Sequence, residues 1–380
     1  MRSTLGTLRR LRSFSVLAVL GCSLGYSQLS VVLDDGSTVP VTSKHPRITF
    51  GPKQTPPGPV SGLQFYTGHY SSFGKSLAFN IVGSDPALGA STTTVPTVIV
   101  PIKLVFASSG VTRDGTNVAA ATLNSPIFLT ADYTTGATDV GVTQYGDAIQ
   151  RAQFWNSPGF SQAGYHVLLG APTVAATVTI NVPVGSGNTF GSGKLGVVDP
   201  TFFDAILNGL VPSYTANQLP IFLTDNVFEG TNGLISQCCV LGYHASQGPP
   251  IVSARTWIYA AYTQPGTFVG NAIVDVQALS HEVSEWMNDP FVGTPLLGGI
   301  NLIAPAKLPG QGGACIINFE TGDPLEAPPI AFAKVTNGTT YHLQDEVFLW
   351  WYTHVLSPGV NGFLTYLGTF LTPSSLCGAG

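Results

Sequence analysis

The chain has 380 residues, of which only 9% are charged and 44% are hydrophobic, and its net charge at pH 7 is −5. This hydrophobic content excludes an intrinsically disordered chain. With only 15 Lys and Arg residues, the sequence lacks the basic clusters that bind nucleic acid. The 44 Gly and 28 Pro residues favour turns and short strands over long helices.

Residues 1–27 have the pattern of a secretion signal. Basic residues precede a short apolar run at residues 14–24, and the small residues Gly25 and Ser27 follow it. This run is shorter than the ~20 apolar residues that a membrane-spanning helix needs, and no later segment reaches that length. We therefore expect a secreted or periplasmic protein without a transmembrane segment, with lipidation at Cys22 as the lesser alternative.

Four cysteines follow this segment, namely Cys238, Cys239, Cys315 and Cys377. In an exported chain an even number favours two disulfides over free thiols. Neighbouring Cα atoms are ~3.8 Å apart across a trans peptide bond, closer than disulfides normally tolerate. We therefore expect Cys238 and Cys239 each to pair with Cys315 or Cys377. The adjacent pair also argues against a four-cysteine zinc site.

The first half of the chain is expected to be rich in β-strands. Residues 28–61, with many Pro, Ser, Thr and Gly, are expected to form an extended arm or linker that leads into a β-rich region at residues 62–197. The clearest strand covers residues 92–106, where Pro96 and Pro101 suggest an edge strand or a bulge. Other expected elements are strands at residues 125–133 and 165–184 and a helix at residues 145–155.

The region 198–380 is expected to mix helices and strands. It either stands alone or forms one domain with the region before it. Asp199 as cap, Pro200 in the first turn and Gly209 near the end predict a helix at residues 199–210. A second helix is expected to end at Pro290. Strands are expected at residues 219–228, 238–244 and 255–263. The fold class predicted from these elements is α+β, with strands that support a central helix.

The helix that is expected to begin near Asp275 carries the sequence His281-Glu282-x-x-Glu285. Residues four apart share one face of a helix, so His281 and Glu285 can direct a nitrogen and an oxygen at one divalent ion. Glu282 would sit where a general base takes a proton from water. The chain has only six Glu, which favours a metal site over the alternative, an ordinary polar face of an amphipathic helix turned to water.

A metal site of this kind needs a third ligand from another segment. Glu320 is the first candidate, Asp323 the second and Asp289 the third. His244 and His342 remain as further donors. A set of donors with more carboxylates than imidazoles is a harder Lewis base than a two-histidine site, and this lowers its preference for Zn²⁺ relative to Ca²⁺ or Mn²⁺. We expect a divalent metal, with Zn²⁺ as the leading candidate and Ca²⁺ or Mn²⁺ as alternatives.

Three segments resemble those of a group of secreted bacterial zincin-like proteins, which is distantly similar to the plant phosphate-induced, EXORDIUM-like cell-wall proteins. The segments are CCVLGYH at residues 238–244, SHEVSEWMNDPF at residues 280–291 and FETGDPLE at residues 319–326. The resemblance covers mainly residues 230–355. It implies an extracellular, zincin-like helix-and-sheet core within residues 198–380 but no particular substrate. The plant proteins have a similar Asn-Pro-Phe turn after the helix but lack its His-Glu pair.

Two functions from different classes fit these features. The first is a secreted metal-dependent hydrolase of the metallopeptidase kind. In that protein His281, Glu285 and either Glu320 or Asp323 bind the metal, and Glu282 is the catalytic base. The second is a noncatalytic extracellular protein of the cell surface or wall, with a structural or vestigial metal site. A peptide or an extracellular cell-wall polymer is the expected partner.

Overall fold

The computed structural model describes residues 30–33, 36–40, 62–72, 75–134, 138–248, 253–292, 306–309, 313–316, 318–326 and 329–377. The predicted secretion signal with Cys22, and most of the expected arm, lie outside the described residues. Helices and strands are mixed along the described chain, in agreement with an α+β fold in the general sense. None of the helices in these ranges is both long enough and apolar enough to cross a membrane.

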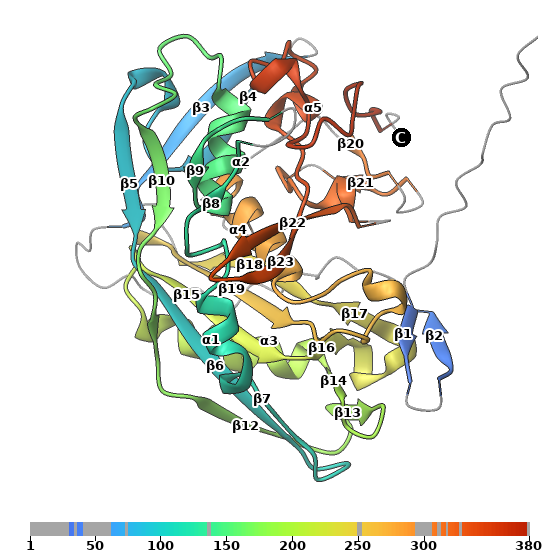
Figure 1. Cartoon of the computed structure of the whole chain (residues 1–380). Helices are drawn as coiled ribbons and strands as arrows, with labels where there is room; N and C mark the ends of the chain where they lie inside the picture. The colour runs from blue at the N-terminus through green and yellow to red at the C-terminus, as the bar shows by residue number, and fades with distance from the viewer. Residues whose placement is uncertain are drawn as a thin grey trace, which may run out of the picture.

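A seven-stranded sheet lies at the centre of the molecule (Figure 1). The order of its main path is β11 (Thr173–Val174), β6 (Thr97–Phe106), β15 (Leu219–Asp225), β19 (Arg255–Tyr262) and β18 (Gly242–Gln247), while β12 (Val178–Val182) and β7 (Thr112–Asp114) also pair with β6. Strands β6, β15 and β19 are parallel, whereas β18 runs antiparallel to β19 at the edge. Strands from residues 62–197 and from residues 198–380 therefore share one sheet.

Strand β6 lies inside the sheet, which corrects the edge position that was expected from its prolines. Pro96 separates β5 (Ser91–Val95) from β6. On one side of β6, β11 pairs with residues 98–99 and β12 begins its pairing at Ile102. Pro101 thus lies opposite the break between two neighbouring strands. A residue without an N–H group is tolerated there because no ladder hydrogen bond is lost.

Helices cover both faces of the central sheet. Helices α1 (Thr116–Leu123), α2 (Tyr145–Phe154) and α4 (Gln277–Asn288) belong to the hydrophobic core on one face. Helix α3 (Pro200–Leu210) belongs to the core on the other face. Because successive strand residues point to opposite faces, each central strand contributes to both cores.

The expected helices are present, and their local signals operate as predicted at α3. There the carboxylate of Asp199 accepts a hydrogen bond from the Phe202 N–H, and Pro200 stands in the first turn. The prediction of a strand at residues 125–133 is wrong for most of this segment. Most of it forms turns, and only β8 (Ala131–Asp132), which pairs with β9 (Val142–Thr143), is a strand. The Ser-Pro dipeptide that starts the segment favours a turn, and the N–H of Leu129 donates to Ser125 O.

The remaining strands form smaller sheets and hairpins around the centre. They are β1 (Ser30–Val32) with β2 (Thr38–Pro40), β3 (Phe65–Ser72) with β4 (Lys75–Val82), β5 with β10 (Tyr165–Leu169), β13 (Gly187–Phe190) and β14 (Leu195–Val198) with β16 (Val227–Gly230) and β17 (Cys238–Val240), β20 (Ala306–Lys307) with β21 (Cys315–Ile316), and β22 (Ala331–Thr336) with β23 (Thr339–Gln344). Helix α5 (Leu349–Thr353) follows β23. The described part of the expected arm is therefore a hairpin, β1–β2, and the N–H of Val32 donates to Thr267 O.

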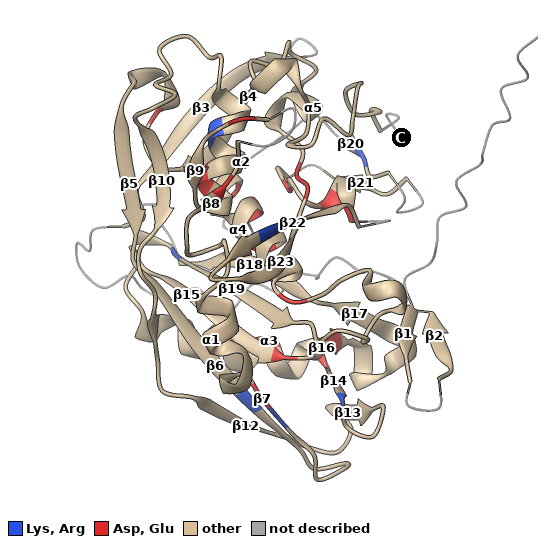
Figure 2. Ribbon diagram, in the orientation of Figure 1, with Lys and Arg blue, Asp and Glu red and all other residues tan. Residues whose placement is uncertain are grey.

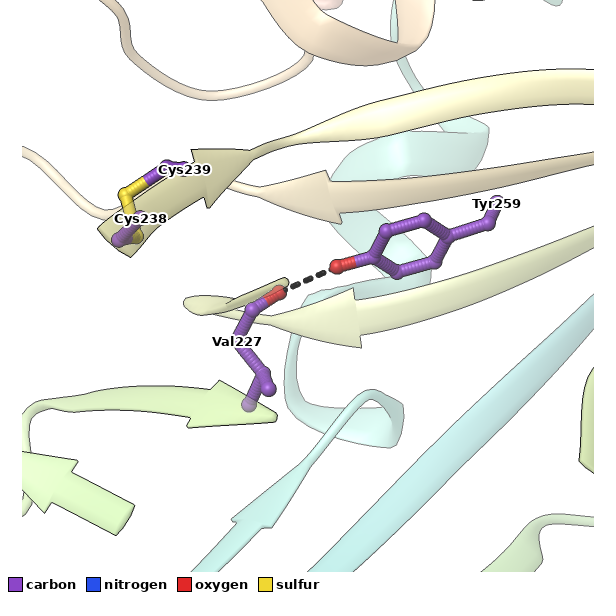
Figure 3. Close-up of a disulfide and its surroundings, with 4 residues drawn as sticks. All are labelled: Val227, Cys238, Cys239 and Tyr259. Atoms are coloured by element: carbon purple, nitrogen blue, oxygen red, sulfur yellow. Dashed lines mark hydrogen bonds between the residues drawn. A yellow bond between two sulfur atoms is a disulfide. The ribbon is translucent and has the colours of Figure 1, made fainter. Parts of the chain in front are cut away.

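The disulfides differ from those expected. Cys238 is bonded to its neighbour Cys239 (Figure 3), and Cys315 is bonded to Cys377. The expectation assumed the Cα spacing of a trans peptide bond. The bond between the two adjacent cysteines is cis and their Cα atoms are 3.0 Å apart. Beside this pair, the Tyr259 hydroxyl donates to Val227 O at 2.7 Å.

Candidate metal centre

Helix α4 is buried along its whole length, contrary to the alternative in which its polar face is turned to water. All twelve residues from Gln277 to Asn288 are buried. Strands β18 and β19, hairpin strand β23 and helix α2 all contact the helix. Its polar side chains must therefore find partners inside the protein. The alternative of a hydrated helix face is excluded for His281, Glu282 and Glu285.

On α4, the imidazole of His281 faces three carboxylates. Its Nε2 lies 3.1 Å from Glu285 Oε2 and 3.9 Å from Glu282 Oε1. It also lies 3.7 Å from Oδ1 of Asp323, which comes from the separate segment 318–326. The four-residue spacing along the helix brings His281 and Glu285 together, as expected from their sequence positions. Imidazole nitrogen and carboxylate oxygen are both ligands of divalent metals.

Backbone groups of segment 318–326 hold Glu285 in place. The N–H groups of Gly322 and Asp323 donate to Glu285 Oε1 at 2.9 and 3.2 Å. The other carboxylate oxygen, Oε2, is the one directed at His281. The two oxygens of Glu285 therefore have separate roles, one structural and one available to the site.

Strand β18 brings a second histidine to α4. His244 Nδ1 lies 3.4 Å from Glu282 Oε2 and 3.7 Å from Glu285 Oε2. On the opposite edge of the ring, Nε2 lies 3.6 Å from Glu320 Oε2 and 3.1 Å from the backbone oxygen of Asp289. The alternation of side chains along β18 turns His244 toward α4 while the residues before and after it face α3.

The two candidate third ligands belong to different groups of donors. Asp323 approaches His281, and Glu326, which the sequence did not single out, joins these two residues. Glu320, the first choice from the sequence, lies instead with His244 and Glu285. Glu326 follows Asp323 by three residues in a chain with few Glu, a signal that a closer reading of this segment would have found.

Two other candidates from the sequence have different roles. The Asp289 carboxylate accepts a hydrogen bond from the Phe319 N–H at 3.2 Å and so helps to join α4 to segment 318–326. His342 contacts Asp275, with 2.7 Å between Nδ1 and Oδ2, and does not line the pocket described below. Asp275 does not cap α4 through its side chain, because its Oδ1 accepts from Val276 N just before the first turn.

The electrostatics of the cluster reflect several buried charges of one sign. Burial and then the neighbouring carboxylates raise the pKa of Glu320 well above its ordinary value. Burial opposes the charged form of His281, yet the Glu285 and Glu282 carboxylates raise the pKa of this imidazole well above its usual range. Burial alone would raise the pKa of Glu285, but the His281 charge and hydrogen bond lower it to about 2. The cluster thus favours a positively charged partner.

A pocket of about 230 Å³ opens onto these residues. Two histidines and five acidic residues form its polar side, and Val240, Leu241, Ile273 and Val292 contribute to its apolar side. None of the described residues that line it is Lys or Arg. Figure 2 shows acidic residues near α4 and β21, and others near α2, α3 and β16.

Three groups of side chains bring donor atoms within 4.8 Å of one another. They are His281 with Glu282 and Glu285, His281 with Asp323 and Glu326, and His244 with Glu285 and Glu320. Glu320 Oε2 is buried and accepts no hydrogen bond from the described residues, as expected of an oxygen that faces a cation. The side chains present are therefore able to hold a metal ion.

Comparison with known proteins assigns the chain to no family. No protein-family model matches the chain, and neither curated proteins nor solved structures give a significant match. The zincin-like and EXORDIUM-like resemblance stays a prediction from the sequence.

Proposed function

We propose that the chain is an exported metal-dependent hydrolase. His281, Glu285 and Asp323 hold a divalent ion, and Glu282 is the general base. The proposal depends on one observation, the approach of Glu285 Oε2 and Asp323 Oδ1 to His281 Nε2 at 3.1 and 3.7 Å beside an open pocket.

The donor set supports a divalent metal of intermediate hardness. One imidazole with two carboxylates suits Zn²⁺ and Mn²⁺, and further carboxylates leave Ca²⁺ as an alternative. When bound, such an ion supplies Lewis acidity, which polarises a carbonyl group and makes a water molecule a stronger acid. The backbone N–H groups of Gly322 and Asp323 keep Glu285 oriented toward the ion through its second oxygen.

Glu282 is proposed as the base because of its position between the two histidines. Its Oε1 lies 3.9 Å from His281 Nε2 and its Oε2 lies 3.4 Å from His244 Nδ1. A carboxylate so placed accepts a proton from the attacking water and returns it to the leaving group. The walls of the pocket exclude bulk water from this step, since Glu282 is only 5% exposed.

A peptide or a related extracellular polymer is the proposed substrate. The pocket has an apolar side next to the polar one, which suits an apolar group beside the bond that is cleaved. The two disulfides fit an oxidising compartment outside the cytoplasm. The predicted zincin-like resemblance supports an amide bond as the target.

The test compares the protein with its Glu282→Gln variant. Both are loaded with Zn²⁺ or Mn²⁺, their metal content is measured, and hydrolysis of a broad peptide library is followed by mass spectrometry. We expect the variant to keep its metal and to lose at least about 100-fold in kcat/KM, as for removal of a general base. Glu229→Gln is a matched control, because burial raises the pKa of Glu229 well above its ordinary value and a neutral amide replaces a neutral acid.

Two results contradict the proposal. Equal activity of the Glu282→Gln variant would remove Glu282 from the reaction. If the metal-loaded protein cleaves nothing, and chelation lowers its melting temperature, then the metal is structural and the chain belongs to the noncatalytic class.

A further inference from the structure

The donor groups around α4 include two that share no residue. One consists of His281, Asp323 and Glu326, and the other consists of His244, Glu285 and Glu320. Within each group the donor atoms lie within 4.8 Å of one another. Donors around one ion lie at most ~4.6 Å apart, because each is ~2.0–2.3 Å from the metal. Each group therefore has nearly the size of a complete coordination site.

Glu320 gives an independent indication of a second cation. The residue is only 9% exposed, and its Oε2 accepts no hydrogen bond from the described residues. This oxygen lies 3.6 Å from His244 Nε2, and Glu320 belongs to the donor group of His244 and Glu285. An ionised carboxylate oxygen buried without a donor is costly, so a cation bound at this position would stabilise the charged form of Glu320.

Glu285 lies between the two groups. Its Oε2 is 3.1 Å from His281 Nε2 and 3.7 Å from His244 Nδ1. One carboxylate oxygen is thus within reach of both histidines, which come from different elements of the fold. A carboxylate in this position is able to bridge two metal ions, as in two-metal hydrolytic sites whose ions are ~3.5–4 Å apart.

The charge of the pocket also exceeds what one ion neutralises. Five acidic side chains line it, and none of the described lining residues is Lys or Arg. If all five carboxylates ionise and both imidazoles are neutral when metal binds, the five negative charges exceed the two positive charges of one divalent ion. Because buried charges of one sign repel strongly at low dielectric, the second ion is favoured.

We propose that the pocket binds two divalent ions bridged by Glu285. The first ion takes its other ligands from His281, Asp323 and Glu326, and the second takes them from His244 and Glu320. This inference rests on the metal site of the proposed function and adds an ion to it. Glu282 is a ligand of neither ion and keeps its role as base.

The test counts Mn²⁺ ions on the full chain. Protein freed of metal by a chelator is dialysed against increasing free Mn²⁺, bound metal is measured, and electron paramagnetic resonance is recorded at each step. We expect two Mn²⁺ per chain. We also expect the six-line spectrum of isolated Mn²⁺ to be replaced by a spin-coupled spectrum as the second ion binds.

Variants assign the two positions. Glu320→Gln and His244→Gln are each expected to reduce the stoichiometry to one and to retain an uncoupled spectrum. The affinity for the second ion should fall by at least about 100-fold, more than for loss of an outer hydrogen-bond partner. His342→Gln and Glu229→Gln are matched controls outside the pocket and are expected to retain two coupled ions.

Saturation at one Mn²⁺ per chain with an uncoupled spectrum overturns the inference. This result is read from the unmodified protein, so a variant that fails to fold does not weaken it. One ion with peptide hydrolysis would leave the proposed function intact and remove only the second site. Two coupled ions without any hydrolysis would support the second site and contradict the hydrolase.

Discussion

Gly322 lies directly against the imidazole of His281. A Cβ atom at this position would be 2.4 Å from Nδ1 and 2.6 Å from Cε1 of the ring. The backbone of Gly322 has φ −87° and ψ −33°, a conformation open to any residue. The position thus requires glycine because of this contact and not because of its conformation. The same residue donates its N–H to Glu285, so it touches two of the proposed ligands.

We expect Gly322→Ala to displace the ring of His281 or the segment that covers it. Affinity for Mn²⁺ should fall at least about 10-fold, as when the support of a metal ligand is lost, and equilibrium dialysis measures it. Gly209→Ala is the matched control, because a Cβ there meets nothing within 4 Å. In helix α3 that change should leave affinity unchanged and raise stability by about 0.5–1 kcal/mol. Unchanged affinity in Gly322→Ala would show that the contact does not position His281.

Single residues of the site were predictable where the spacing on one helix determines their position. His281, Glu282 and Glu285 belong to α4, and the four-residue spacing placed His281 and Glu285 on one face, with Glu282 directly after His281 in sequence. Glu326 was missed, and His244 was considered only as an additional donor. His244 reaches the site because β18 pairs with β19, and such pairing between distant segments leaves no trace in local spacing.

At the scale of elements, α4 is the part of the fold that every segment of the site contacts. The indole Nε1 of Trp286 donates to Thr256 Oγ1 on β19 at 2.9 Å, and both residues are buried. On the opposite side, Gln153 of α2 donates to Asn288 Oδ1 at 3.0 Å. These two bonds connect the helix to the sheet below it and to the helix beside it.

Thr256→Val should weaken the attachment of α4 to the sheet. The substitution keeps the shape of the side chain but leaves the buried indole N–H of Trp286 without an acceptor. We expect the free energy of unfolding in urea to fall by about 1–3 kcal/mol. Thr263→Val is the control, because Thr263 Oγ1 is buried without a hydrogen-bond partner in the described structure, and this change should be neutral or stabilising. Equal losses in both variants would attribute the effect to packing.

Elements with strong local sequence signals were predictable. The burial and position of elements that depend on tertiary contacts were not. Helix α3 begins at the predicted cap because Asp199 bonds to its first turn. Helix α4 was placed correctly, but its burial on both faces depends on segment 318–326 and β18, which its own sequence does not specify. The proline at position 101 suggested an edge strand or a bulge. The strand lies inside the sheet because the neighbouring strands β11 and β12 leave a break opposite Pro101, and the sequence of β6 alone does not show that break.

At the scale of the whole molecule, the site joins parts of the chain that lie far apart. His244 lies on an edge strand of the central sheet, His281 and Glu285 lie on the helix above it, and segment 318–326 covers both. The α+β class followed from composition and element pattern. The order of the strands did not, because pairing in this largely parallel sheet connects residues far apart in sequence, such as Ile221 with Ile258 and Leu219 with Thr97.

The disulfide between Cys315 and Cys377 connects this covering segment to the C-terminal part of the chain. It joins residues 62 apart in sequence, and Ile316, Asn318 and Glu320 follow Cys315 along the wall of the pocket. The C-terminal part is also held by β20, where Lys307 N donates to Ser375 O at 2.8 Å. The disulfide therefore fixes one end of the segment that supplies Glu320 and Asp323.

Replacing Cys315 and Cys377 together by Ser should lower the free energy of unfolding by about 4 kcal/mol, because the unfolded chain regains the entropy of a long loop. Guanidinium unfolding measures this loss, and dialysis should show weaker Mn²⁺ binding because Glu320 and Asp323 are held less firmly. The double replacement of Cys238 and Cys239 is the matched control: its disulfide links adjacent residues and closes no long loop, so it should cost much less by this route. If both pairs of replacements cost the same, the stabilisation does not come from loop closure, and the covering segment is held by its noncovalent contacts.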